Sequence, residues 1–241
     1  MAQFFTDFSG DTIGSLPSYL TLYGAVTSLV ESDAAAANGV SLRMNRESGP
    51  GARGAILNTF PARQYGRVES VSRIRISSTS HIVNFSVGNL GNTPRIQIEN
   101  GLRIYRTTNT LASIPNVLPI DTFQWYRMVR DPIQNIMAGK IWVDGDPEPS
   151  EWGVYWDSDA VSNPEDTLRF FFSSSVFSSH WVDVAGIGTD GDPAPTGPLS
   201  TTEAFALRHN PRTNKVIPVL SSPTVTDIGA NCVRPRVTKG Y

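Results

Sequence analysis

The sequence predicts an all-β protein, a sandwich of two sheets, and three observations support this prediction. Short apolar or alternating runs follow one another closely, with Gly, Pro and Asn between them. The 241 residues include 20 Gly and 17 Pro, which suits many short strands and turns. No stretch of helical length carries an apolar stripe at helical spacing. Four consecutive Ala after Asp33 could form one helical turn or a loop.

The run 66–77 shows the strand pattern most clearly. It alternates Ile74 and Ile76 on one face with Arg73 and Arg75 on the other. Further strands are expected at 80–87, 95–98, 102–106, 123–130, 136–143, 152–156, 167–173 and 180–188. About a dozen short strands of this kind fit two stacked sheets.

The character of the chain changes after residue 195. We expect residues 1–195 to form the sandwich domain and residues 196–241 to form an extended C-terminal arm or a small β appendage. The second part is too short for a core of its own, so it should pack on the main domain or reach a neighbouring subunit. Pro235 favours an edge strand there. The residues expected to carry this assembly arm are Val216, Ile217, Val219, Val225, Ile228, Val233 and Val237.

Composition excludes several classes of protein. Charged residues make up 17% of the chain, the net charge is −2 and the arginines are scattered, so no patch for nucleic acid is expected. One cysteine, Cys232, cannot form an internal disulfide framework or a thiolate metal cluster. The sequence begins without a signal-peptide pattern and has no apolar run long enough to span a bilayer. We therefore expect synthesis in a cytoplasm and no membrane insertion.

Three segments resemble a known family. Residues 5–17 (FTDFSGDTIGSLP), 125–152 (WYRMVRDPIQNIMAGKIWVDGDPEPSEW) and 181–195 (WVDVAGIGTDGDPAP) are similar to the concanavalin-like, laminin-G-type jelly rolls of phage virion proteins. Residues 218–238 resemble connector sequence in phage structural proteins. The resemblance implies a concanavalin-like jelly-roll sandwich in a bacteriophage virion, as a tail-tip or tail-fibre component or a capsid decoration. The Pro-punctuated extended tail favours self-association, so we expect a homo-oligomer that contacts other virion proteins, after synthesis in the bacterial host cytoplasm.

Acidic residues decide whether an enzyme is expected. Related sandwiches include glycoside hydrolases, which need two carboxyl groups about 5–9 Å apart. The strands holding Glu69 and Asp183 offer no second acid on the same face. Asp157 and Asp159 form such a pair, but before Asn163-Pro164 they are typical of a solvated turn. We therefore expect no catalytic residues and no enzyme.

Carboxylates on turns raise the question of a metal. Asp144, Asp146 and Glu148, and likewise Asp190 and Asp192, offer the oxygen ligands that calcium prefers. Asp-Gly is also a common turn dipeptide, so structural calcium is one alternative and an empty turn is the other. No other cofactor is expected.

Aromatic residues suggest where a partner would bind. Trp142 and Trp181 lie inside alternating strands and are expected in the core. Trp152, Tyr155 and Trp156 follow a Pro-rich turn and are the candidates for a glycan-binding or interface surface, and the alternative favoured for them is burial in the core or a subunit contact. The main hypothesis is a structural, adhesive virion protein that acts by assembly. The alternative is a carbohydrate-binding module for host surface glycans, and a glycoside hydrolase ranks below both.

Overall fold

The structure is a computed structural model, and the chain divides into two units, residues 1–198 and 199–241. The described residues are 2–24, 26–46, 53–58, 66–77, 83–87, 95–98, 101–106, 109–115, 119–157, 168–172, 179–197, 207–210 and 215–218. They contain strands and turns and no helix, which confirms the predicted all-β class. Accordingly, none of them belongs to a helix that could cross a membrane.

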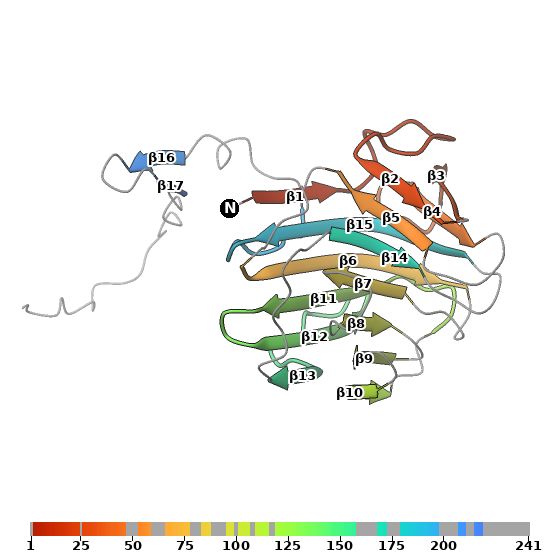
Figure 1. Ribbon diagram of the computed structural model, residues 1–241. Coiled ribbons are helices and arrows are strands. Elements are labelled where there is room, and N and C mark those ends of the chain that lie inside the picture. The colour runs from red at the N-terminus through yellow and green to blue at the C-terminus, as the bar shows by residue number, and fades with distance from the viewer. Residues whose placement is uncertain are drawn as a thin grey trace, which may run out of the picture. The chain divides into compact units, whose positions relative to one another are not determined.

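Two antiparallel sheets make up the first unit (Figure 1). In the described residues the larger sheet has the order β13 (Val154–Asp157), β12 (Ile136–Val143), β11 (Gln124–Asp131), β6 (Val68–Ile76), β15 (Ser179–Thr189), β4 (Val40–Arg46) and β3 (Val26–Ser32), and β1 (Ala2–Thr6) also pairs with β15. The smaller sheet has the order β10 (Asn109–Pro115), β9 (Gly101–Arg106), β8 (Arg95–Ile98), β7 (Val83–Val87), β14 (Leu168–Phe172), β5 (Arg53–Leu57) and β2 (Leu20–Tyr23). In the second unit, β16 (Leu207–Asn210) and β17 (Lys215–Pro218) form a hairpin.

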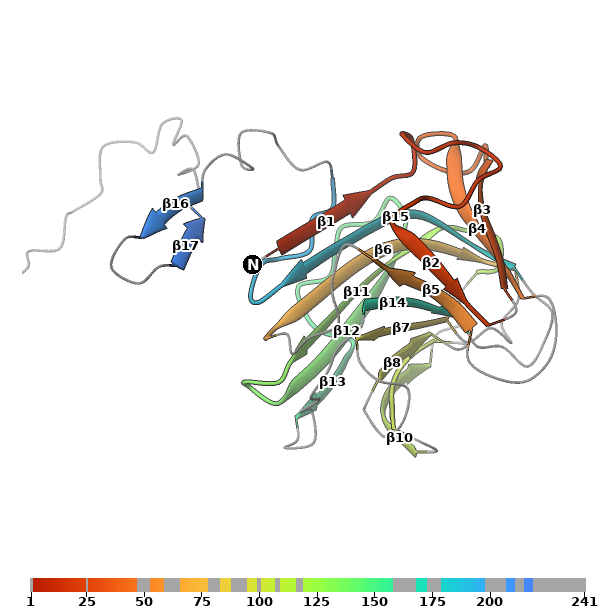
Figure 2. The ribbon, with the colours of Figure 1, turned by 45° about the horizontal axis from the view of Figure 1, so that its top comes forward.

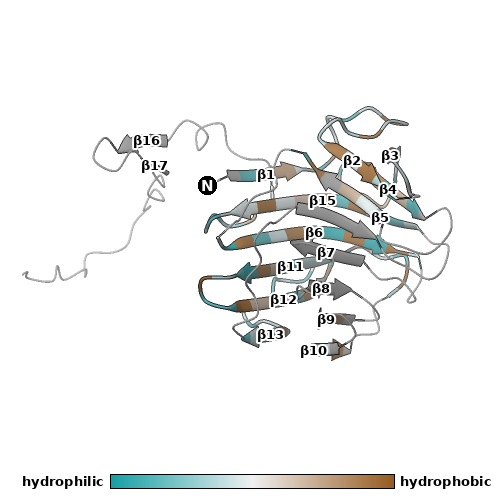
Figure 3. Cartoon of the chain, viewed as in Figure 1, coloured by the Kyte–Doolittle hydropathy of each residue, from teal (hydrophilic) through white to brown (hydrophobic). Residues whose placement is uncertain are grey.

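Figure 2 shows the two sheets from a second direction. The hydrophobic core lies between them. Strand residues alternate between two faces, so every second side chain of the larger sheet enters this core. Hydrophilic and hydrophobic bands accordingly follow one another along β6 (Figure 3). The fully buried core residues with the largest side chains are Tyr126, Phe8, Leu42, Met44, Leu57, Ile74, Leu102, Ile104 and Ile187. Their burial determines which face of each strand is left for a site.

Strand β15 changes its partner halfway along, and this positions the site. Residues 179–182 pair with β4, whereas residues 185–189 pair with β1. The register of β15 against β6 shifts between Val182 and Val184, so Asp183 occupies a β-bulge. The turns at 33–39 join β3 to β4, and the backbone N–H of Ala37 donates to Asp183 Oδ2 at 3.2 Å. The four-alanine segment is therefore a loop that packs on the bulge, not a helix.

A short strap, residues 192–195, crosses the outside of β15. A Cβ atom built on Gly188 would lie 2.5 Å from the carbonyl oxygen of Pro193, and one on Gly186 would lie 3.0 Å from Pro195 C. Only glycine at these two positions leaves room for the strap. Gln3 Nε2 donates to Pro193 O at 2.7 Å, and Ala194 is buried. This end of the sheet is therefore covered by the chain itself.

Candidate functional site

The outer face of the larger sheet, turned away from the core, carries an unusual set of side chains. Ile74, Tyr126 and Val182 enter the core, so their strand neighbours point the other way. Register places Trp125 opposite Arg73 and Trp142 opposite Trp125. Arginines and tryptophans thus meet on one surface.

The prediction that Trp142 and Trp181 fill the core is wrong. Both rings are half-buried and belong to the outer face. Their neighbours Ile141 and Val182 pack in the core or against it. On strands with apolar residues on both faces, the alternation alone does not show which face is inside.

Trp125 and Trp142 form a stacked pair, which we call the tryptophan platform. The ring centroids are 6.0 Å apart and the planes differ by 8°. Trp125 Nε1 donates a hydrogen bond of 2.8 Å to Asp144 Oδ1. Asp144 follows β12 in a turn where Gly145 has a φ of 91°, which glycine adopts without strain. The platform is therefore a half-exposed apolar surface with a carboxylate at its side.

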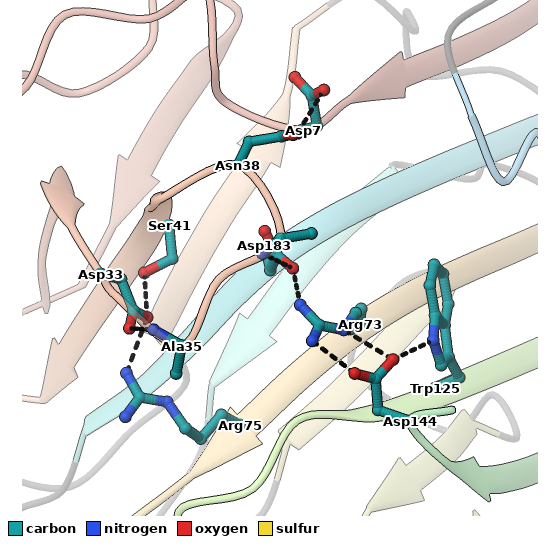
Figure 4. A network of polar contacts seen from close by, with 11 residues as sticks. Asp7, Asp33, Ala35, Asn38, Ser41, Arg73, Arg75, Trp125, Asp144 and Asp183 are labelled. Atoms are coloured by element: carbon teal, nitrogen blue, oxygen red, sulfur yellow. Dashed lines mark hydrogen bonds and ion pairs between the residues drawn. The ribbon is translucent and has the colours of Figure 1, made fainter. Parts of the chain in front are cut away.

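Arg73 joins this carboxylate to a buried one (Figure 4). Its Nε and Nη2 donate to Asp144 Oδ1 at 3.0 Å and Oδ2 at 2.6 Å, a two-pronged contact. Its Nη1 forms an ion pair with Asp183 Oδ2. Hydrogen bonds from Arg73, against partial burial, hold the pKa of Asp144 below its ordinary value. Asp144 is therefore ionised and fixed in place beside the platform.

Asp183 has no exposed surface, and its Oδ1 accepts a hydrogen bond from none of the described residues. Burial raises the pKa of this carboxyl, although Ala37 and Arg73 act in the opposite direction. The buried carboxylate of Asp183 therefore holds the guanidinium of Arg73 in place beside Asp144.

Arg127, two residues after Trp125 on β11, also lies between two carboxylates. It forms an ion pair with Glu69 on one side, and its Nη2 donates to Glu148 Oε2 at 3.0 Å on the other. Lys140, its cross-strand neighbour, places Nζ 2.7 Å from Glu148 Oε1 and 4.9 Å from the ring centroid of Trp152. Despite partial burial, which raises it, Lys140 and Arg127 hold the pKa of Glu148 below its ordinary value.

Cations and rings alternate across the rest of the outer face. The guanidinium of Arg43 lies 5.9 Å and that of Arg75 4.2 Å from the ring centroid of Trp181. Arg75 also lies 5.2 Å, and Arg73 4.5 Å, from the ring centroid of Phe123. Distances below about 6 Å give favourable cation–π attraction. Arg43 and Arg75 also form ion pairs with Glu31 and Asp33, so charged and aromatic side chains cover this part of the face beside the platform.

The structure separates the three predicted glycan-binding aromatics. Trp156 packs against the core, whereas Tyr155, its neighbour on β13, is 50% exposed on the opposite face. Trp152 is half-buried and contacts Lys140. Trp152 therefore adjoins the network around Glu148, and Trp156 does not.

Two of the predicted calcium ligands, Asp144 and Glu148, form ion pairs, and structural calcium stays a prediction. Arg73 holds Asp144, and Arg127 and Lys140 hold Glu148, while Asp146 is exposed. Asp190 Oδ1 accepts from Gly66 N at 3.0 Å, and burial raises the pKa of Asp192. Across the described ranges no group of three His, Cys, Asp or Glu could hold a metal ion. Both Asp-Gly pairs form turns.

Other predicted residues lie partly outside the described part of the chain. Asp157 ends β13, and Asp159 is not among the described residues. Val216 and Ile217 lie in β17. Val219, Val225, Ile228, Val233 and Val237 are outside the described residues. The assembly arm stays a prediction.

The comparisons with known proteins establish the fold class. No protein-family model matches, and no curated protein matches. Among solved structures, a seed lectin of Lotus tetragonolobus is 9% identical with a TM-score of 0.53, covering 78% of this chain and 98% of the lectin. Peanut lectin is 7% identical with a TM-score of 0.56, covering 78% and 97%. Cellulose-induced protein Cip1 is 16% identical with a TM-score of 0.54, covering 80% and 100%.

The first unit is thus a concanavalin-like jelly-roll sandwich, as predicted. Identities this low describe the fold alone, and fold does not determine function.

Proposed function

We propose that this protein is a non-catalytic carbohydrate-binding protein and that the tryptophan platform is its contact with sugar. The observation that carries the proposal is the stacked, half-exposed pair Trp125 and Trp142 with Asp144 beside it. The C–H groups of a pyranose ring are attracted to the electron-rich face of an aromatic ring. A carboxylate at the edge of that face can accept a hydrogen bond from a sugar hydroxyl, which sets orientation.

The structural neighbours support the same class of function. Several are lectins, and one, a winged bean lectin, was solved in complex with methyl-α-D-galactose, at 8% identity and a TM-score of 0.54. Trp152, and Tyr155 on the neighbouring strand, extend the proposed surface toward β13.

The carboxylates at the platform favour binding over hydrolysis. A glycoside hydrolase needs one carboxyl group that is protonated near neutral pH and can donate its proton. The pKa values of Asp144 and Glu148 are instead lowered. Asp183, whose pKa is raised, has no exposed surface from which to reach a substrate.

Assembly on a bacteriophage particle, as a tail-fibre component or capsid decoration, stays a prediction that no comparison supports. A carbohydrate-binding role does not require it.

Affinity electrophoresis of the full chain in gels containing soluble polysaccharides tests the proposal. We expect at least one polysaccharide to retard the chain. Trp142→Ala should weaken that retardation about tenfold or more, as loss of a central aromatic contact does. Ile133→Ala is the matched control, because Ile133 is 81% exposed at the far end of the same hairpin. No retardation by any glycan, or equal retardation of Trp142→Ala, would refute the proposal.

A further inference from the structure

Charged groups around the tryptophan platform lie at two levels, with cations beneath and carboxylates outside. The side chain of Arg73 is 9% exposed and that of its partner Asp144 is 37% exposed. The side chains of Arg127 and Lys140 are 13% and 11% exposed, whereas that of Glu148, which both contact, is 32% exposed. Each arginine also has a buried carboxylate on its other side, Asp183 or Glu69.

This two-level arrangement determines which hydrogen-bonding groups are available to a bound molecule. Among the described residues, the hydrogen bonds and ion pairs of these cations reach carboxylates and one backbone oxygen, that of Pro149, which Lys140 contacts at 2.8 Å. From the described residues, Asp144 Oδ2 accepts one hydrogen bond, that of Arg73, and a carboxylate oxygen can accept two. The platform is therefore bordered by acceptors.

Among the side chains on and beside this sheet that the structure describes, two other arginines have a much larger exposed fraction than Arg73 and Arg127. Arg43, 39% exposed, lies on β4, three strand spacings or about 14 Å from Trp125 on β11. Arg67, 42% exposed, precedes β6 and lies six residues, or about 20 Å along the strand, from Arg73, but its partner Glu69 also contacts Arg127. Both are ion-paired, to Glu31 and Glu69. The charges of Asp144 and Glu148 are compensated by Arg73, Arg127 and Lys140, which lie on the inner, more buried side of the two carboxylates.

We infer that the tryptophan platform selects uncharged glycans and rejects those bearing carboxylate or sulfate groups. The inference rests on the proposed function and specifies its ligand. A neutral pyranose supplies hydroxyl donors to Asp144 and Glu148 while its ring lies on the tryptophans. An acidic sugar would meet the outer carboxylates before the more buried cations that pair with them. Like charges brought together across an interface oppose binding.

Matched glycans that differ in charge test the inference. Dextran, galactomannan and mixed-linkage β-glucan serve as neutral probes, and dextran sulfate, alginate and pectate as acidic ones. At about 0.15 M salt we expect the tightest-binding neutral glycan to bind at least about tenfold more tightly than any acidic one. The double variant Asp144→Asn/Glu148→Gln should narrow this ratio, and so should raising the salt to about 1 M, because screening weakens repulsion.

The results distinguish failure of the proposed selectivity from failure of the proposed carbohydrate binding. If acidic glycans bind as tightly as neutral ones, and Trp142→Ala abolishes that binding, the selectivity is overturned and the proposed function stands. If none of the six glycans binds, both are overturned. If the ratio is as expected but unchanged in the double variant, the carboxylates are not its cause and the inference fails.

Discussion

Arg73 of β6 and Asp183 of β15, 110 residues apart in the sequence, form an ion pair in which the carboxylate has no exposed surface. The pair lies at the bulge where β15 passes from β4 to β1. Arg73 carries Asp144 on its other side, so the buried pair supports the edge of the tryptophan platform.

Replacing Arg73 by Met should strongly destabilise the fold. The substitution leaves Asp183 buried without its cation, and breaking a buried pair in this way costs about 3–5 kcal/mol. Urea unfolding followed by tryptophan fluorescence measures the loss. Arg67→Met is the control, since its ion pair with Glu69 is exposed on the arginine side and should contribute less than about 1 kcal/mol. Equal losses in the two variants would contradict this account.

Asp144→Asn should lower stability in a pH-dependent way. The pKa of Asp144 is lower in the folded protein than in the unfolded chain, where it is about 3.9. The folded state therefore gains stability from the ionised group above that pH and loses it as the pH falls through the folded-state pKa. The difference in unfolding free energy between wild type and variant should be present at pH 7 and shrink toward pH 3. A difference that stays constant with pH would mean that ionisation of Asp144 is not its source.

Gly188→Ala should displace the strap formed by residues 192–195. The new Cβ would lie 2.5 Å from Pro193 O, and backbone there cannot yield without losing the hydrogen bond from Gln3. We expect a loss of about 1–3 kcal/mol, the usual cost of overpacking. Thermal unfolding measures it, with Gly197→Ala as the control because no atom lies within 4 Å of its Cβ position. A fall in melting temperature no larger than that of the control would count against a tightly packed strap.

A chain ending at Pro198 should fold without the second unit. Every buried hydrophobic residue of the described part of the chain lies between Phe8 and Ala194. We therefore expect a cooperative thermal transition within a few degrees of that of the full chain. Light scattering on both chains tests the predicted arm at the same time. A change from oligomer to monomer on truncation would support a joining arm, whereas a monomer in both cases would contradict assembly through that segment in solution.

Much of the architecture follows from local pattern. The alternation of Ile74 and Ile76 with Arg73 and Arg75 predicts β6, and the apolar runs at 136–143 and 180–188 predict β12 and most of β15. Glycines in Asp-Gly pairs predict the turns at Gly145 and Gly191, both of which have positive φ. Such features depend on neighbours in the chain, so the sequence contains them directly.

The candidate site depended on information that the sequence does not hold locally. A period of two divides a strand into two faces without saying which one is buried. For that reason the sequence pattern predicted Trp142 and Trp181 in the core, whereas in the structure they lie on the outer face. The register between strands places Trp125 opposite Trp142 and Arg73 opposite Trp125. The β-bulge in β15 directs the side chain of Asp183 toward Arg73. The sequence by itself determined that the chain would form stacked sheets. The tertiary structure decided which side chains meet, because pairing between distant strands is settled by burial of the whole core.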